Sequence, residues 1–261
     1  NPWEFEIVKA LSNTGVVSLA GSTAMATQGV VYRPLENPLH DLDFNTYATG
    51  KVNSNEDAKA EVDKILNQVR QSDIQNRKHV RTMNNPNKET GNIDNYTVTY
   101  LVLADADGRT IPSDSITLEQ EDYVQRGETK NDNTHQRVIV NGEVIGHIVR
   151  GNITFTKAGF KGKLLDFFVH PNGVKLSNGT QLHPREYNYK GTILLMTDYR
   201  MALAAKQRWA RLKDIFDYNR FVKNEQELTT RIVESTNNNN SKAIIDMLNE
   251  VVGKVTIRTK T

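Results

Sequence analysis

The chain has 261 residues, 37% hydrophobic and 25% charged, which is enough to bury a core in one large domain or two small ones. Its 33 basic and 31 acidic side chains nearly cancel, so a formal charge of +2 excludes a general electrostatic attraction to nucleic acid or to an anionic membrane. The chain has no cysteine, which excludes disulfides and thiolate metal sites. No apolar run has the length of a membrane span, so we expect a soluble, globular protein without a membrane partner.

The N-terminal stretch predicts a strand, a tight turn and a helix in direct succession. Residues 3–11 have the spacing of an amphipathic helix, and residues 16–20 have the composition of a short buried strand. Gly21 and Ser22 follow this strand immediately and open a second predicted helix, whose first-turn N–H groups can bind anions. The pattern therefore predicts a phosphate cradle at Gly21 and Ser22.

Two carboxylates one residue apart come next, in a predicted strand. Alternation along residues 41–45 puts Asp41 and Asp43 on one face of this strand and Leu42 and Phe44 on the other. One face can then bind a metal while the other packs. Residues 55–71 after this strand predict a helix with a polar outer face.

The middle of the chain predicts strands, turns and one long loop. The expected elements are a strand over residues 96–103, a turn over 105–108, a mobile polar loop over 113–136, a hairpin over 138–145 and a further strand within 148–155. The Asn141-Gly142 pair gives the hairpin its characteristic turn signal.

Asp166 stands out because it lies inside a strongly apolar predicted strand, residues 164–169. A charge in such a run is expected to be paired or metal-bound. The C-terminal part predicts a short strand over 193–196 and then helices, the first of which, over 197–222, carries Lys206 and Asp214.

These carboxylates are the residues that metal-dependent nucleotidyl transfer needs. The reaction uses two divalent ions about 3.5 to 4 Å apart, held by shared carboxylates. Asp41 and Asp43 would bind both ions, Mg²⁺ or Mn²⁺, and Asp166 would complete the acceptor-side ion and help to deprotonate the attacking hydroxyl. Arg33 and Lys206 are candidates to neutralise the triphosphate of the NTP.

Two blocks of the sequence resemble a known family. The run Gly21-Ser22-Thr23-Ala24-Met25, then Arg33, then Asp41-Leu42-Asp43-Phe44 resembles the opening signature of the DNA polymerase β-like nucleotidyltransferase superfamily. It is most similar to the AbiEii-type (abortive infection) toxins. Residues 195–217 resemble that family's helical lysine and its later Arg-Lys-Asp-x-x-Asp motif. Ser22 stands where the family commonly has a second glycine, and the interval between Asp43 and Asp166 is longer than the family pattern.

The resemblance implies an α/β (α+β) fold with a polymerase β-like core, a small mixed sheet, a β-rich insertion and a C-terminal helical bundle. The core would comprise residues 1–71 and 157–190, the insertion 72–156 and the helical domain 191–261. It further implies that Lys206 binds the nucleotide and Asp214 supports the active centre. The acceptor would be RNA, such as a tRNA 3′ end, or protein, and the chain a cytoplasmic toxin of bacterial or phage origin with an antitoxin partner.

The Asp41-x-Asp43 motif has three other interpretations. A haloacid-dehalogenase phosphatase is disfavoured, because its aspartates end an apolar run whereas residues 37–40 here are Asn-Pro-Leu-His. A glycosyltransferase that uses Asp-x-Asp to hold a metal and a nucleotide sugar stays open, as does a non-catalytic binding or structural protein that keeps the fold. The second Asp-x-Asp, at Asp105 and Asp107, is predicted to form a hairpin turn and not a calcium loop.

Overall fold

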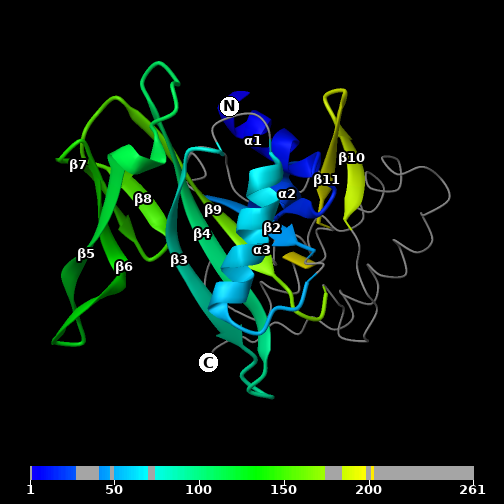
Figure 1. Ribbon diagram of the computed structural model, residues 1–261, viewed down its shortest axis with the longest axis horizontal. Coiled ribbons are helices and arrows are strands. Elements are labelled where there is room, and N and C mark those ends of the chain that lie inside the picture. Colours follow the sequence, from blue (N-terminus) through cyan, green and yellow to red (C-terminus); the bar gives the residue numbers. More distant parts are fainter. Residues whose placement is uncertain are drawn as a thin grey trace, which may run out of the picture. The chain divides into compact units, whose positions relative to one another are not determined.

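A computed structural model describes residues 2–27, 41–47, 50–69, 74–173, 184–197 and 201–202, which form a mixed α/β structure built mostly of strands in two sheets (Figure 1). The helices are α1 (Pro2–Ser12), α2 (Gly21–Thr27), α3 (Asn55–Gln68) and the 3-10 helix η1 (Ser113–Ser115). The strands are β1 (Val17–Ala20), β2 (Asp41–Thr46), β3 (Arg77–Pro86), β4 (Ile93–Asp105), β5 (Ile116–Gln125), β6 (Glu128–Val140), β7 (Glu143–Val149), β8 (Asn152–Phe155), β9 (Phe160–Val169), β10 (Arg185–Tyr189) and β11 (Thr192–Met196).

The chain divides into two compact units, residues 1–19 with 39–195 and residues 20–38 with 196–261. In the second unit the described part is mainly α2, which begins at Gly21 directly after β1. Gly21 has a φ of +63°, a left-handed conformation that favours glycine, so a glycine suits this sharp change from strand to helix. The predicted strand, tight turn and helix are confirmed here.

The first unit is built on a seven-stranded sheet with the order β10-β11-β1-β2-β9-β4-β3. The central pair, β2 and β9, is parallel, whereas β9 with β4 and β4 with β3 are antiparallel, so the predicted mixed sheet is confirmed. Strands β3 and β10 have no counterpart in the elements predicted from the sequence. Most side chains of both strands are at least partly exposed, and neither strand has the apolar runs that identified its neighbours.

Helices α1 and α3 pack against one face of this sheet, which we call the helix face. On it Phe44 of β2 stacks on Phe167 of β9 at a centroid distance of 5.2 Å, and Tyr100 of β4 meets Phe167 edge-on. The Tyr100 hydroxyl donates to Asp63 of α3, and Figure 1 shows α3 lying along the strands. On the same face Lys163 of β9 pairs with Glu4 of α1 at 3.1 Å.

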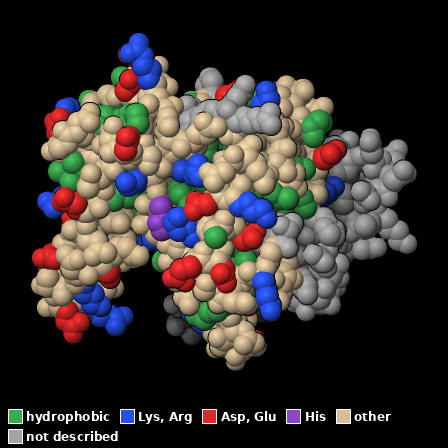
Figure 2. All heavy atoms as spheres, viewed as in Figure 1, with side chains coloured by type: hydrophobic (Ala, Val, Ile, Leu, Met, Phe, Trp, Pro, Cys, Tyr) green, Lys and Arg blue, Asp and Glu red, His purple; other side chains and the backbone are tan. Residues whose placement is uncertain are grey.

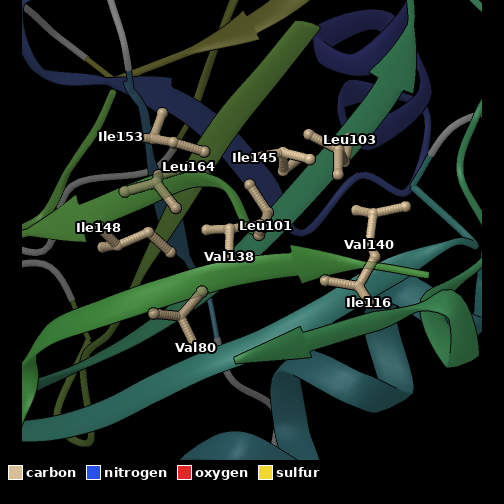
Figure 3. Packing of buried hydrophobic residues seen from close by; sticks show 10 residues of the cluster. All are labelled: Val80, Leu101, Leu103, Ile116, Val138, Val140, Ile145, Ile148, Ile153 and Leu164. Atoms are coloured by element: carbon tan, nitrogen blue, oxygen red, sulfur yellow. The ribbon is translucent and has the colours of Figure 1, made fainter. Parts of the chain in front are cut away.

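A second sheet, with the order β5-β6-β7-β8, covers part of the opposite face. The two sheets share one apolar cluster, shown in Figure 3. The first sheet contributes Val80, Leu101, Leu103 and Leu164, and the second contributes Ile116, Val138, Val140, Ile145, Ile148 and Ile153. Beyond this cluster, the polar face of the first sheet carries Asp41, Asp43 and Asp166, and we call it the carboxylate face.

The prediction of a mobile loop over residues 113–136 is wrong. These residues form η1, β5 and the first part of β6, joined by a turn at Arg126 and Gly127, both with positive φ. Strand β7 pairs with β6 only from His135 onward, so the outer part of the β5–β6 hairpin is a two-stranded ribbon. Such a ribbon has little apolar surface to bury, and its polar composition resembles that of a loop.

Most of the other local predictions are confirmed. Helices α1 and α3 match the predicted stretches, with Ser54 capping α3 by accepting the Asp57 N–H at 3.1 Å. The turn after Asp105 and the hairpin at Asn141-Gly142 also form. The predicted C-terminal helical domain, residues 191–261, lies outside the described residues except for residues 191–197, 201 and 202.

The domain boundaries predicted at residues 72 and 156 stay a prediction. The described strands between them belong to both sheets. Strands β3 and β4 are part of the seven-stranded sheet, next to β9. The separate sheet begins at Ile116 and ends at Phe155.

Candidate metal centre

Strand β2 turns Asp41 and Asp43 away from the helix face. Successive side chains of a strand point to opposite faces. Leu42 and Phe44 are each 1% exposed in the core between the sheet and the helices. Asp41 and Asp43, which alternate with them, must therefore lie on the carboxylate face. The sequence alternation is therefore the direct cause of the orientation of both carboxylates.

Strand β9 brings Asp166 to the same face. In the parallel pairing of β2 and β9, Asp43 lies opposite Asp166, and the flanking Phe44 and Phe167 are also partners. One ligand atom from each of Asp41, Asp43 and Asp166 can be chosen so that all three lie within 4.8 Å of one another. The structure thus brings together three predicted site residues that come from distant parts of the chain.

The hydroxyl of Thr99 holds the Asp166 carboxylate in place. Thr99 lies opposite Asp166 on the antiparallel neighbour β4 and donates a hydrogen bond to Oδ1 at 2.6 Å. Thr99 is 1% exposed, so this donor cannot readily exchange its partner for bulk water. In sequence it was one threonine among several in a predicted strand, and nothing marked it as a site residue.

The pKa of the Asp166 carboxyl is raised to about 6, mainly because the group is buried, and the negative charge of Asp41 raises it further. The Thr99 hydrogen bond and the charge of Arg81 act in the opposite direction. Ionising all three carboxylates together is therefore costly. A divalent cation would remove that cost, and carboxylate oxygens are ligands that Mg²⁺ and Mn²⁺ prefer, so the donor set fits such an ion.

Arg81 is a further charged residue on this face that the sequence did not identify. It lies on β3 opposite Thr99, and its charge acts on Asp166. A β-carbon added to Gly151, in the turn between β7 and β8, would lie 3.0 Å from Nη2 of Arg81. No sequence motif surrounds Arg81, so only the register of β3 could have indicated it.

Asn45 and His170 border the centre at the next positions along β2 and after β9. The Nε2 atom of His170 lies 2.9 Å from Oδ1 of Asn45, and because the amide oxygen accepts, the imidazole donates. Burial lowers the pKa of His170 to about 4, although the charge of Asp94 opposes this shift. The imidazole is therefore neutral at physiological pH.

The other predicted site residues are not tested by the described part of the chain. Gly21 and Ser22 open α2 in the second unit, and their relation to the aspartates stays a prediction. Arg33, Lys206 and Asp214 lie outside the described residues.

Comparisons with known proteins give no relative: no family model, no curated protein and no solved structure matches this chain. Among the described residues, no helix has the length and apolar character needed to cross a membrane. Figure 2 shows acidic and basic side chains interspersed over the face in view, in keeping with the nearly balanced charge of the sequence.

Proposed function

We propose that this chain is a Mg²⁺- or Mn²⁺-dependent nucleotidyltransferase that moves a nucleotidyl group from an NTP to a hydroxyl of an RNA or protein acceptor. The observation that carries the proposal is the carboxylate cluster: Asp41, Asp43 and Asp166 converge within 4.8 Å on two parallel neighbouring strands. Two carboxylates one residue apart on one strand, with a third on its neighbour, suit the sharing of two divalent ions.

Each residue of the cluster has a proposed role. Asp41 and Asp43 would hold both ions, and Asp166 would hold the acceptor-side ion only. Bound divalent ions would supply charge neutralisation for the triphosphate and would activate the acceptor hydroxyl. Thr99 fixes the orientation of Asp166 through its hydrogen bond.

The reaction forms one bond and breaks one at the α-phosphorus of the NTP. The acceptor oxygen bonds to this phosphorus while the bond to the bridging oxygen of pyrophosphate breaks, and pyrophosphate leaves with that electron pair. The acceptor hydroxyl loses its proton, and Asp166 is the proposed acceptor of it. Burial favours this role, because a carboxylate with a raised pKa is a stronger base than an ordinary aspartate.

The nucleotide side of the proposal rests on the sequence resemblance. Gly21 and Ser22 would bind the phosphates, Arg33 and Lys206 would neutralise them, and Asp214 would support the centre. The same resemblance is the basis for proposing a toxin with an antitoxin partner in a bacterial or phage-derived setting.

The test is transfer of label from each NTP, labelled either at the α- or at the γ-phosphate, with Mg²⁺ and with or without total RNA. We expect α-label but no γ-label to appear on RNA or on protein. The Asp41→Asn, Asp43→Asn double variant should lose transfer, while Asp105→Asn, Asp107→Asn, which alters the other Asp-x-Asp of the chain, should retain it. Transfer that is absent from the wild type, or equal in the Asp41, Asp43 variant, contradicts the proposal. A parallel reaction with labelled nucleotide sugars tests the glycosyltransferase alternative.

A further inference from the structure

A row of four side chains crosses the sheet from the carboxylates to a single cation. Asp43 of β2 is the partner of Asp166 of β9, Asp166 is the partner of Thr99 of β4, and Thr99 is the partner of Arg81 of β3. Side chains at directly opposed positions of neighbouring strands lie on one face of a sheet. The carboxylates therefore occupy one end of the row and the guanidinium group the other.

The backbone fixes Arg81 at this place. The register of β3 against β4 shifts between His79 and Arg81, and the intervening Val80 packs into the apolar cluster between the two sheets. On the other side, the guanidinium approaches the turn at Gly151, which has a φ of +80° and no side chain to obstruct it. Arg81 is thus held between its own strand and a turn of the second sheet.

Part of the hydrogen-bonding capacity of Arg81 is unused within the described residues. Its Nε atom is buried and has no hydrogen-bond partner among them. Within the described part of the chain, Arg81 forms no ion pair at contact distance with a carboxylate, although its charge acts on Asp166. The residue as a whole is only partly buried, so its guanidinium group suits a ligand that supplies acceptor oxygens.

We infer that Arg81 binds a phosphate of a single-stranded RNA acceptor, at the phosphodiester next to the terminal 3′-hydroxyl. This inference rests on the proposed function and identifies its acceptor as RNA. The planar guanidinium presents paired N–H donors whose geometry matches two phosphate oxygens.

The position of Arg81 favours the acceptor over the NTP. It lies on the side of Asp166 away from β2, which carries Asp41 and Asp43. Of the three carboxylates, Asp166 is the one proposed to hold the acceptor-side ion only, and the row from Asp166 through Thr99 leads to Arg81. In an RNA chain the phosphate that precedes the terminal nucleoside is separated from the attacking 3′-hydroxyl by one ribose, so an anion accompanies the acceptor hydroxyl there. A hydroxyl of a protein side chain carries no such obligatory anion.

The test compares the wild type with Arg81→Gln and with Arg109→Gln, which removes an exposed arginine from a turn. The probe is a fluorescent single-stranded RNA with a free 3′-hydroxyl, titrated with Mg²⁺ present and NTP absent, so that no transfer occurs. We expect Arg81→Gln to weaken RNA binding about tenfold, as for loss of a charge-assisted hydrogen bond. The slope of log affinity against log salt concentration should become less negative by about 0.7. Arg109→Gln should change neither, and binding of NTP without RNA should be unchanged in both variants.

The outcomes separate this inference from the proposed function. RNA affinity that is unchanged in Arg81→Gln overturns the inference, while transfer that depends on Asp41 and Asp43 would still support the proposed function. Weaker NTP binding with normal RNA binding also overturns it, because Arg81 would then serve the nucleotide. RNA binding through Arg81 without any label transfer supports the RNA site and contradicts the transferase. If Arg81→Gln does not fold, Arg81→Lys decides: it keeps the charge, so the salt dependence should be retained while the affinity falls.

Discussion

Thr99 donates a 2.6 Å hydrogen bond to Asp166 across neighbouring antiparallel strands. The bond favours the ionised form of Asp166 and so opposes the effect of burial, which raises the pKa of this group. Thr99 thereby keeps the most buried of the three carboxylates available as a ligand at neutral pH.

We predict that Thr99→Val weakens binding of Mn²⁺ by about tenfold, the usual scale for residues that orient a metal ligand. Valine keeps the shape of threonine but not its donor, so the pKa of Asp166 should rise further and protons should compete better with the ion. The loss should therefore be larger at pH 6 than at pH 8, as measured by titration calorimetry. Thr117→Val, at an exposed position of β5, is the matched control. Equal affinities for wild type and Thr99→Val would show that Asp166 is not a ligand.

The variant Asp166→Asn should be more stable than the wild type at pH 8 in the absence of divalent ions. The folded-state pKa of about 6 lies above the ordinary value of 3.8, so ionised Asp166 destabilises the fold. That penalty is absent below pH 3.8 and complete above about pH 6. At 1.4 kcal/mol per pKa unit, the gain in free energy of unfolding is at most about 3 kcal/mol.

Urea unfolding in the presence of a chelator measures this gain in the free energy of unfolding. The same experiment with Mn²⁺ measures how much the bound ion stabilises each protein. The wild type should be stabilised by the ion, because a ligand that binds only the folded state raises the free energy of unfolding. Asp166→Asn should gain far less. A variant less stable than the wild type in the chelator contradicts the assigned electrostatics.

Local chemistry in the sequence was sufficient to predict the carboxylate pair and its strand. Leu42 and Phe44 alternate with Asp41 and Asp43, and that alternation alone fixes which face each side chain occupies. Asp166 was noticeable for the same reason, as a charge among apolar neighbours. That these three carboxylates meet depends on the pairing of β2 with β9, which no local pattern specifies.

The residues that were missed have ordinary local sequences. Arg81 and Thr99 acquire a role only through the register of β3, β4 and β9. The β5–β6 hairpin was missed because its outer part is a polar two-stranded ribbon with Val124 71% exposed, so apolar periodicity, the main signal of a strand, is weak there.

His170 should make the protein less stable as the pH falls from 6.5 toward 4. Its folded-state pKa of about 4 lies below the ordinary value of 6.5, so in this window the unfolded chain binds more protons. Asp166 has the opposite effect on stability: between pH 3.8 and about 6 the folded chain binds more protons there, so this group stabilises the fold as the pH falls. In the wild type the two changes of stability with pH partly cancel. Asp166→Asn should therefore steepen the loss of stability in acid.

The measurement is the free energy of unfolding at a series of pH values between 4 and 7. Adding His170→Gln to Asp166→Asn should flatten the curve again, because glutamine retains a donor for Asn45 but does not titrate. If the double variant keeps the steep slope, another group is responsible for it.

Lys163 and Glu4 should contribute to stability as a pair and not as separate charges. The Lys163 side chain is 5% exposed, and its Nζ lies 3.1 Å from Oε1 of Glu4 on α1. Glu4→Gln leaves a buried ammonium group without this counter-charge and should cost about 2 kcal/mol, whereas Glu4→Gln with Lys163→Met should recover most of that loss. Lys161→Gln, at an exposed position of the same strand, is the control and should change the free energy of unfolding by less than about 0.5 kcal/mol. Because Lys163 lies on the helix face, Mn²⁺ affinity should stay the same in all these variants. A double variant as unstable as Glu4→Gln alone would mean that Glu4 acts through contacts other than Lys163.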